Sequence, residues 1–169
     1  MMSGIVSIEL LLDPESEELV RVEWERLAAA GLSSAGRHTC PSNRPHVTLL
    51  VRPALSPTRF EAALAALPIA LMLAEPIVFR HGDRGVLARR IVPTEELLSF
   101  HRAVHAAALP GDDAAHTKPG EWTPHVTLAR RLRLDALDQA LWLVGPPHAG
   151  TGIALRRWDS ATREVTPIG

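Results

Sequence analysis

Apolar and polar positions alternate along the chain in a way that predicts strands and helices in turn. Residues 4–13, GIVSIELLLD, form an apolar stretch that predicts a strand. Asp13 and Pro14 then predict a helix start, because a carboxylate caps the first turn and proline suits the first helical position. Apolar residues with helical spacing continue to Gly31, where we expect the helix to end.

The rest of the chain continues this alternation. Ser56 and Pro57 are expected to start a second helix by the same capping logic. Pro76 is expected to break its strand or to mark a sheet edge, because proline cannot donate to a ladder. The tail after Ser160 is expected to add an edge strand. The pattern predicts strands over 45–51, 69–83, 84–93, 124–130 and 150–160, and helices over 56–68, 94–109 and 133–145.

The predicted elements form an internal repeat. Their order is β-α-β-α-β, followed by β-α-β-α-β, and the pentapeptide PHVTL occupies the middle strand of each half, at 45–49 and 124–128. The sequence therefore predicts an α+β fold: one domain over 1–169, with two lobes related by a pseudo-twofold axis around a central cleft. In sequence the lobes cover about 1–83 and about 84–169, and strands can exchange between them.

Composition narrows the function classes. A net charge of −1 gives no global basic field for long duplex nucleic acid, although a local cluster could still bind a small anion. The single Cys40 cannot form an internal disulfide, and no Cys–His spacing resembles a zinc site. No signal peptide or membrane-spanning run is visible. We therefore expect a cytoplasmic protein without a metal or other cofactor and without membrane contact, and we expect a monomer.

The repeated strand carries groups suited to phosphate chemistry. Residues two apart on a strand share a face, so His46 lies beside Thr48, and His125 beside Thr127. Two histidines near a phosphodiester can act as general acid and general base, and threonine hydroxyls can donate to its non-bridging oxygens. A lone His-x-Thr would be an ordinary structural feature. Its repetition in matching strands favours a chemical role.

The two motifs, PHVTL at 45–49 and PHVTLAR at 124–130, resemble the paired His-x-Thr signatures of the 2H phosphoesterase superfamily. Within it, the chain looks most like the bacterial 2′-5′ RNA ligase/cyclic phosphodiesterase (LigT-like) branch. The resemblance implies a bilobal fold and hydrolysis of 2′,3′-cyclic phosphates of RNA ends or nucleotides to 2′-phosphates, or formation and reversal of 2′-5′ linkages. It implies that His46 and His125 are catalytic and that Thr48 and Thr127 bind phosphate.

Several functional alternatives stay open at this point. The sequence does not say which histidine is the acid; we favour His125 as the base for the attacking water and His46 as the acid for the 3′ oxygen. The same cleft could belong to a module that binds nucleotides or RNA ends without turnover. It could also serve the same chemistry on a cyclic phosphate that is not RNA.

Other residues are weaker candidates for the cleft. Arg130 lies five positions after His125 and would contact phosphate only if the strand end turns toward the cleft; otherwise it is a solvated end of a basic run. Arg52 is a less favoured candidate for the same role. Trp122 could stack on a nucleobase or simply cover the core.

The remaining histidines of interest lie outside the motifs. His101 and His105 are spaced as a metal pair on a helix, but no third ligand is obvious, so a structural pair is favoured. His38 and His116 occupy the two loops that precede PHVTL, where either could reach a ligand.

Overall fold

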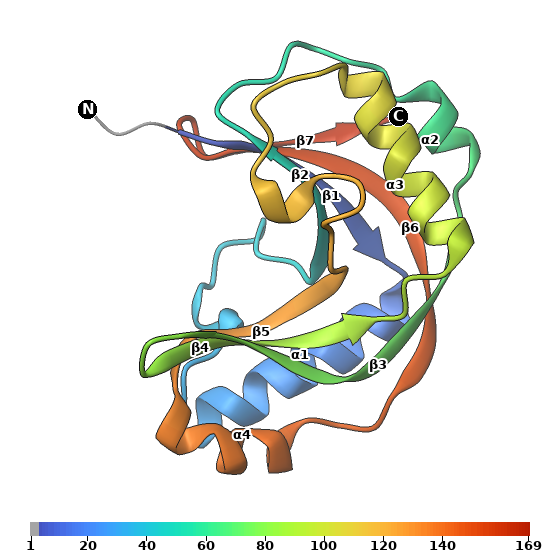
Figure 1. Cartoon of the computed structure of the whole chain (residues 1–169). Coiled ribbons are helices and arrows are strands. Elements are labelled where there is room, and N and C mark those ends of the chain that lie inside the picture. The colour runs from blue at the N-terminus through green and yellow to red at the C-terminus, as the bar shows by residue number, and fades with distance from the viewer. Residues whose placement is uncertain (1–3) are drawn as a thin grey trace.

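The computed structural model describes residues 4–169 and contains the predicted elements in the predicted order. It is an α+β fold whose antiparallel strands form one curved sheet (Figure 1). The strands are β1 (Val6–Leu12), β2 (His46–Arg52), β3 (Ile69–His81), β4 (Arg84–Ile91), β5 (His125–Arg133), β6 (His148–Asp159) and β7 (Glu164–Ile168). The helices are α1 (Pro14–Ala29), α2 (Glu61–Ala65), α3 (Glu95–Ala108) and α4 (Leu137–Leu143), with short 3₁₀ turns at Ala35–Arg37, Ala115–Thr117 and Leu134–Ala136. The sequence-based prediction of the fold class is confirmed.

The two halves of the sheet exchange their third strands. The strand order is β1-β2-β5-β4-β3-β6-β7, and an additional ladder joins β1 to β6. In each half the first two strands pair with each other, β1 with β2 and β4 with β5. The third strand of each half pairs with the first strand of the other half, β3 with β4 and β6 with β1. Neither sequence half therefore completes its sheet alone.

The PHVTL strands meet at a single point. The only Cα partners recorded between β2 and β5 are Val47 and Val126, whereas every other ladder extends over several residues. Val47, Leu49, Val126 and Leu128 are fully buried, as expected for the face of each strand that points away from the histidines. On the opposite face the two strands diverge on either side of this pair, which leaves room for a cleft.

The helices start where the sequence predicts caps, and they pack across the halves. The Asp13 carboxylate accepts from the Ser16 amide at 3.1 Å, and the Thr94 hydroxyl accepts from the Leu97 amide at 3.2 Å. Helix α1 contacts β5 of the other half, and α3 contacts β2 (Figure 1). Across residues 4–169, none of the helices combines the length and the apolar character that a bilayer crossing requires.

The prediction for the second helix is wrong at its start. It does not begin at Ser56 and Pro57; α2 covers only Glu61–Ala65, and Phe60 before it has a left-handed φ of 53°. The Phe60 side chain is 2% exposed, so its ring is an anchor in the core. Burial of this aromatic ring fixes the backbone at Phe60 in a conformation that a helix cannot contain. This tertiary contact outweighs the local capping signal at Ser56 and Pro57.

The strand 69–83 does not break at proline. β3 runs through Pro76, but its pairing changes there: Ile69 to Leu73 pair with β6, and Pro76 to His81 pair with β4. A register shift separates Leu73 from Pro76. Proline thus occupies the irregular point between two ladders, where its missing amide costs no regular hydrogen bond.

Candidate active site

The repeated motif holds both histidine rings in the same way. Nδ1 of His46 lies 2.8 Å from the carbonyl oxygen of Arg44, and Nδ1 of His125 lies 2.7 Å from that of Thr123. A carbonyl oxygen can only accept, so Nδ1 carries the hydrogen in both rings. In both, the contact joins the histidine to the residue two positions before it, across the proline. The motif therefore fixes the tautomer of each ring and leaves Nε2 as the functional nitrogen.

The register between β2 and β5 brings the two motifs together. Val47 is paired with Val126 in an antiparallel sense, and this pair joins the two motif strands at their centres. His46 and Thr127 line one cavity, and His125 and Thr127 line another. This is the juxtaposition that the sequence repeat requires for a shared site.

Two cavities adjoin at this crossing. One, of about 420 Å³, is lined by His46 and by loop residues 33–43, including His38. The other, of about 510 Å³, is lined by His125, His116 and Phe79. Thr127 and Arg130 line both, so they lie between the two histidines. Thr48 shares the face of His46 on β2 but does not line either of these two cavities.

A β-bulge turns Arg130 toward the cleft. Ala129 pairs with Leu87 and Leu132 with Gly85, so β5 has one more residue than β4 between the two pairs. Arg131 in this segment has a left-handed φ of 53°. A second register shift lies between Thr127 and Ala129, which pair with the adjacent residues Ala88 and Leu87. Such irregularities re-aim the neighbouring side chains, whereas strict alternation would have pointed Arg130 away from His125. The turn at the strand end that the sequence left open is therefore present.

His125 has an environment that disfavours its charged form. Burial lowers its pKa, opposed by the hydrogen bond to the Thr123 carbonyl, and the nearby positive charges of His116, His46 and Arg130 lower it further. The Phe79 ring contributes to that burial, with its centroid 4.8 Å from that of His125. The neutral imidazole is thus favoured, with Nε2 available to accept a proton.

His46 has a different environment. Its Nε2 lies 3.2 Å from Oε2 of Glu9, which is almost completely buried on β1. The other oxygen of Glu9 accepts from Nε of Arg156 at 2.8 Å. Sequence reasoning missed Glu9 and Arg156. A charged residue in the middle of the otherwise apolar strand SIELLL was the available signal.

Two tryptophans bind the backbone at the threonines, one for each motif, and Trp24 also lines the cavity beside His46. The indole nitrogen of Trp24, on α1, donates to the carbonyl of Thr127 at 3.0 Å, and that of Trp122 donates to the carbonyl of Thr48 at 2.9 Å. These carbonyls lie where β2 and β5 diverge, so the ladder does not satisfy them. The Trp122 ring also stacks on His101 with centroids 3.9 Å apart, which favours a packing role over contact with a nucleobase.

The other charged and histidine candidates are occupied by structural contacts. Arg52 is buried and donates to Asp113 at 2.6 Å, so it anchors the loop after α3 and does not line the cleft. Both His101 and His105 place Nε2 2.9 Å from the Leu49 carbonyl. Burial lowers the pKa of His101 to about 4. These histidines therefore join α3 to the back of β2.

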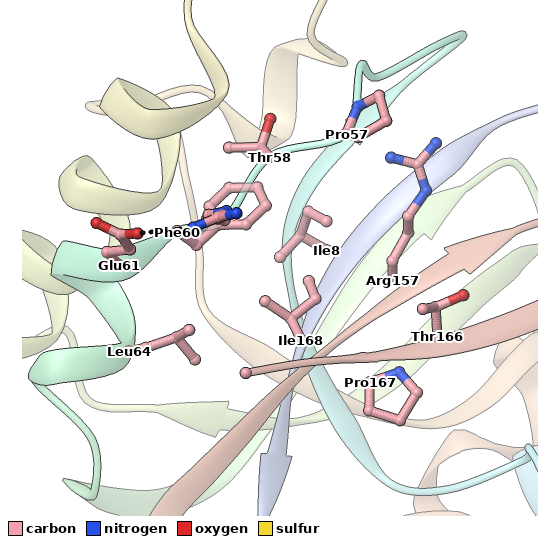
Figure 2. A pocket seen from close by; sticks show the side chains of 12 residues that line it. Ile8, Pro57, Thr58, Phe60, Glu61, Leu64, Arg157, Thr166, Pro167 and Ile168 are labelled. Atoms are coloured by element: carbon pink, nitrogen blue, oxygen red, sulfur yellow. Dashed lines mark ion pairs between the residues drawn. The ribbon is translucent and has the colours of Figure 1, made fainter.

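A larger cavity lies away from the histidines. It measures about 700 Å³ and is formed by residues before and within α2 together with β1, β6 and β7 (Figure 2). Its floor is apolar, with Ile8, Phe60 and Ile168, and no histidine lines it. Among residues 4–169, no group of three histidine, cysteine or acidic side chains is arranged to hold a metal ion.

Comparisons with known proteins identify the family from the sequence and similar folds from the structure. The sequence model of the 2'-5' RNA ligase superfamily matches residues 14–162. The fold is similar to that of Kluyveromyces marxianus Usb1, with 14% identity, a TM-score of 0.52 and coverage of 98% of this chain and 96% of that one. It is also similar to E. coli LigT complexed with 3'-AMP, with 15% identity, a TM-score of 0.52 and coverage of 97% and 94%. No curated protein matches the chain by sequence. As its paired motifs predicted, this chain belongs to the 2'-5' RNA ligase superfamily of 2H phosphoesterases.

Proposed function

We propose that this chain is a metal-independent phosphoesterase that opens 2′,3′-cyclic phosphates of RNA ends or nucleotides to 2′-phosphates. The observation that carries the proposal is the crossing of β2 and β5, where His46 and His125 flank two cavities that share Thr127 and Arg130. The phosphate would occupy this shared region, between an acid and a base. Ring nitrogens on opposite sides of one anion site suit in-line displacement at phosphorus.

The two histidines have complementary roles in this reaction. Nε2 of His125 takes a proton from water as the water oxygen forms a bond to phosphorus. The bond from phosphorus to the 3′ oxygen breaks, and His46 donates its Nε2 proton to that oxygen. The product is a 2′-phosphate, and one proton has moved in net from His46 to His125. The contrasting environments of the rings support this assignment, because burial favours neutral His125 and a carboxylate adjoins His46.

The remaining groups act on the non-bridging oxygens. The hydroxyl of Thr127, which lines both cavities, donates to them, and Arg130 supplies positive charge at the strand end. Thr48 lines neither cavity, so its hydroxyl would donate only to a phosphate that reaches the histidine face of β2. With a 5′-hydroxyl of a second RNA end in place of water, the same bond changes give a 2′-5′ linkage. Hydrolysis and ligation therefore need no change in the roles of the residues.

The size of the ligand is suggested by relatives of the same fold. The structures similar to this chain include LigT complexed with 3'-AMP and Usb1 with uridine monophosphate. Both ligands are single nucleotides. Cavities of about 420 and 510 Å³ beside the histidines are of a size to hold the parts of a nucleotide or of a short RNA end.

Single histidine variants test the proposal. We expect His46→Ala and His125→Ala each to lower kcat on a nucleoside 2′,3′-cyclic phosphate by about 10²- to 10⁴-fold, the usual contribution of a general acid or base. The matched control is His81→Ala, which removes an exposed histidine at the β3–β4 turn. EDTA treatment should leave the wild-type rate unchanged. Full activity in either motif variant would exclude the mechanism.

Measuring affinity and turnover on the same compounds separates the alternatives. We expect 2′,3′-cyclic nucleotides and 2′-5′ dinucleotides to be bound and converted, with products that carry 2′-phosphates. Binding without conversion would identify a nucleotide-binding module. Conversion of a cyclic sugar phosphate in preference to every nucleotide would retain the chemistry and move the substrate outside RNA.

A further inference from the structure

We propose that Glu9, held in place by Arg156 and Ser7, is the positioning residue that keeps a proton on Nε2 of His46 and so makes His46 the acid of the pair. The inference rests on the proposed function, since it explains how two identical motifs take opposite roles. It adds a carboxylate and its buried counter-ion to the site.

Strand register places Glu9 beside the motif. In the ladder between β1 and β2, Glu9 pairs with Thr48 and Leu11 pairs with His46, so Glu9 and His46 are diagonal neighbours on one face. In the ladder to β6, Glu9 pairs with Arg156. His46, Thr48, Glu9 and Arg156 therefore share the face of the sheet that carries the histidine.

Every contact of the Glu9 carboxylate fixes its position. Oε1 accepts from Nε of Arg156 at 2.8 Å, and Oε2 accepts from the hydroxyl of Ser7 at 3.0 Å. Arg156 in turn donates through Nη1 to the carbonyl of Ser42 at 2.8 Å, in the loop before His46. Glu9 and Arg156 are each 5% exposed. Because both are buried and paired, the carboxylate has little freedom to leave the ring.

The two contacts of His46 suit a ring with hydrogens on both nitrogens. Nδ1 faces the carbonyl oxygen of Arg44, and Nε2 faces the carboxylate of Glu9. Both partners are acceptors only, so the ring satisfies both contacts when it is the imidazolium. His46 also lines the cavity, so a leaving oxygen that approaches Nε2 would take the place of Glu9 as the acceptor of this hydrogen and then take the proton.

The second motif lacks this carboxylate. Thr127 pairs with Ala88 on β4, as Thr48 pairs with Glu9 on β1. Within the described residues, no carboxylate contacts Nε2 of His125, and its one recorded hydrogen bond is the Nδ1 contact to Thr123. Glu9 and Ala88 therefore occupy equivalent positions beside the two motifs, and only Glu9 carries a carboxylate.

Arg156 makes a carboxylate tolerable beside an anion site. A lone buried carboxylate would repel a phosphate, and it would also carry a large desolvation cost. The Arg156 guanidinium partly compensates the carboxylate charge through its contact with Oε1, and Oε2 lies toward His46. We therefore assign Arg156 to holding Glu9 and not to direct contact with phosphate.

Glu9→Gln removes the charge and nearly keeps the shape. We expect kcat on a nucleoside 2′,3′-cyclic phosphate to fall by about a hundredfold, the lower end of a general acid's contribution, with KM changed little. Glu9→Asp keeps the charge on a shorter chain and should restore part of the rate. Glu75→Gln is the matched control, because Glu75 is exposed and pairs with Arg90 at the surface.

A readout independent of turnover accompanies the kinetics. Nitrogen-15 shifts of the His46 ring, compared at one pH, should report a larger share of the ring with hydrogens on both nitrogens in the wild type than in Glu9→Gln. If Glu9→Gln does not fold, the same spectra of Glu9→Asp and Ser7→Ala provide the test. An unchanged ring and an unchanged kcat in folded Glu9→Gln would overturn the inference. A doubly protonated His46 in an inactive wild type would instead overturn the proposed function alone.

Discussion

The two halves carry the same PHVTL strand, but the strands beside it bury their charged residues on opposite faces. In β1, Glu9 lies opposite Thr48 on the cleft side, and Leu10, opposite Val47, lies in the core. In β4, Ala88 lies opposite Thr127, and Arg89, opposite Val126, is the fully buried residue behind the sheet. Because side chains alternate along a strand, a shift of one position moves a charge from the site to the core.

This difference separates the motif residues, which are the same in both halves, from the residues of the neighbouring strands, which differ and set the environment of each histidine. The motif strands supply equivalent histidines and threonines with equivalent ring contacts. The neighbouring strands then make the equivalents unequal, with a carboxylate beside His46 and only burial and positive neighbours around His125. In a two-histidine acid–base site, unequal environments favour one histidine as the base and the other as the acid.

The largest effect on the free energy of unfolding is expected from removing Arg89, the buried charged residue of β4. Arg89 pairs with Glu23 of α1 and donates to the carbonyls of Ala74 at 2.9 Å and Gly145 at 2.7 Å. Arg89→Met leaves the buried Glu23 carboxylate without its cation, so we expect a loss of about 3–5 kcal/mol in the free energy of unfolding. Urea denaturation followed by tryptophan fluorescence measures it.

The equivalent position in the other half provides the control. Leu10→Met introduces the same side chain at the matching place in β1, and we expect it to cost less than about 1.5 kcal/mol, because it nearly conserves volume. The double variant Arg89→Met with Glu23→Met should regain most of the lost stability. Equal losses in Arg89→Met and Leu10→Met would show that the two strands differ only in packing.

Replacing the two tryptophans that bind the motif backbones should show a smaller difference in the free energy of unfolding. Trp24→Phe and Trp122→Phe each remove the hydrogen bond to a threonine carbonyl. We expect about 1–2 kcal/mol for Trp24, which is 4% exposed, and less for Trp122, whose partly exposed site lets water replace the donor. Trp142→Phe, at a residue 88% exposed, should have no effect on urea denaturation. A greater loss for Trp122 would contradict this ranking.

The repeat predicted the candidate site, whereas the difference between its two halves could not be predicted from the sequence. Identical pentapeptides in matching elements predicted two strands, a shared face and the pair His46 and His125, because period-two alternation is local. Glu9 gave only one polar letter in a strand. Its meaning depends on the ladder that sets it beside Thr48, which is a contact between segments about forty residues apart.

The failures elsewhere have the same origin in tertiary contacts. Ser56 and Pro57 form a good local helix start, but the core takes the ring of Phe60 and the chain turns left-handed there. Arg130 could not be assigned to a face by alternation, because the bulge at Arg131 depends on pairing with β4. Local signals predicted the helices and strands, whereas contacts between distant segments set where α2 begins and where the Arg130 side chain points.

The smallest expected effect is a shift in the pH dependence of the base. Burial and neighbouring positive charges lower the pKa of His125 from its ordinary value of 6.5, so the neutral ring persists at lower pH than in a free histidine. A base acts when deprotonated, so the rate rises as pH increases through this pKa, and the acid limb of kcat/KM should lie below 6.5. His116→Ala removes one of those positive charges and should move the limb toward higher pH, while His81→Ala should leave it in place. Because these charges act on His125 in the free enzyme, the profile of kcat/KM is the measurement that reports them. If His116→Ala instead leaves the acid limb in place and moves the alkaline limb, His125 is the acid, because an acid loses its activity as pH rises through its pKa. The roles proposed for the two histidines would then be reversed.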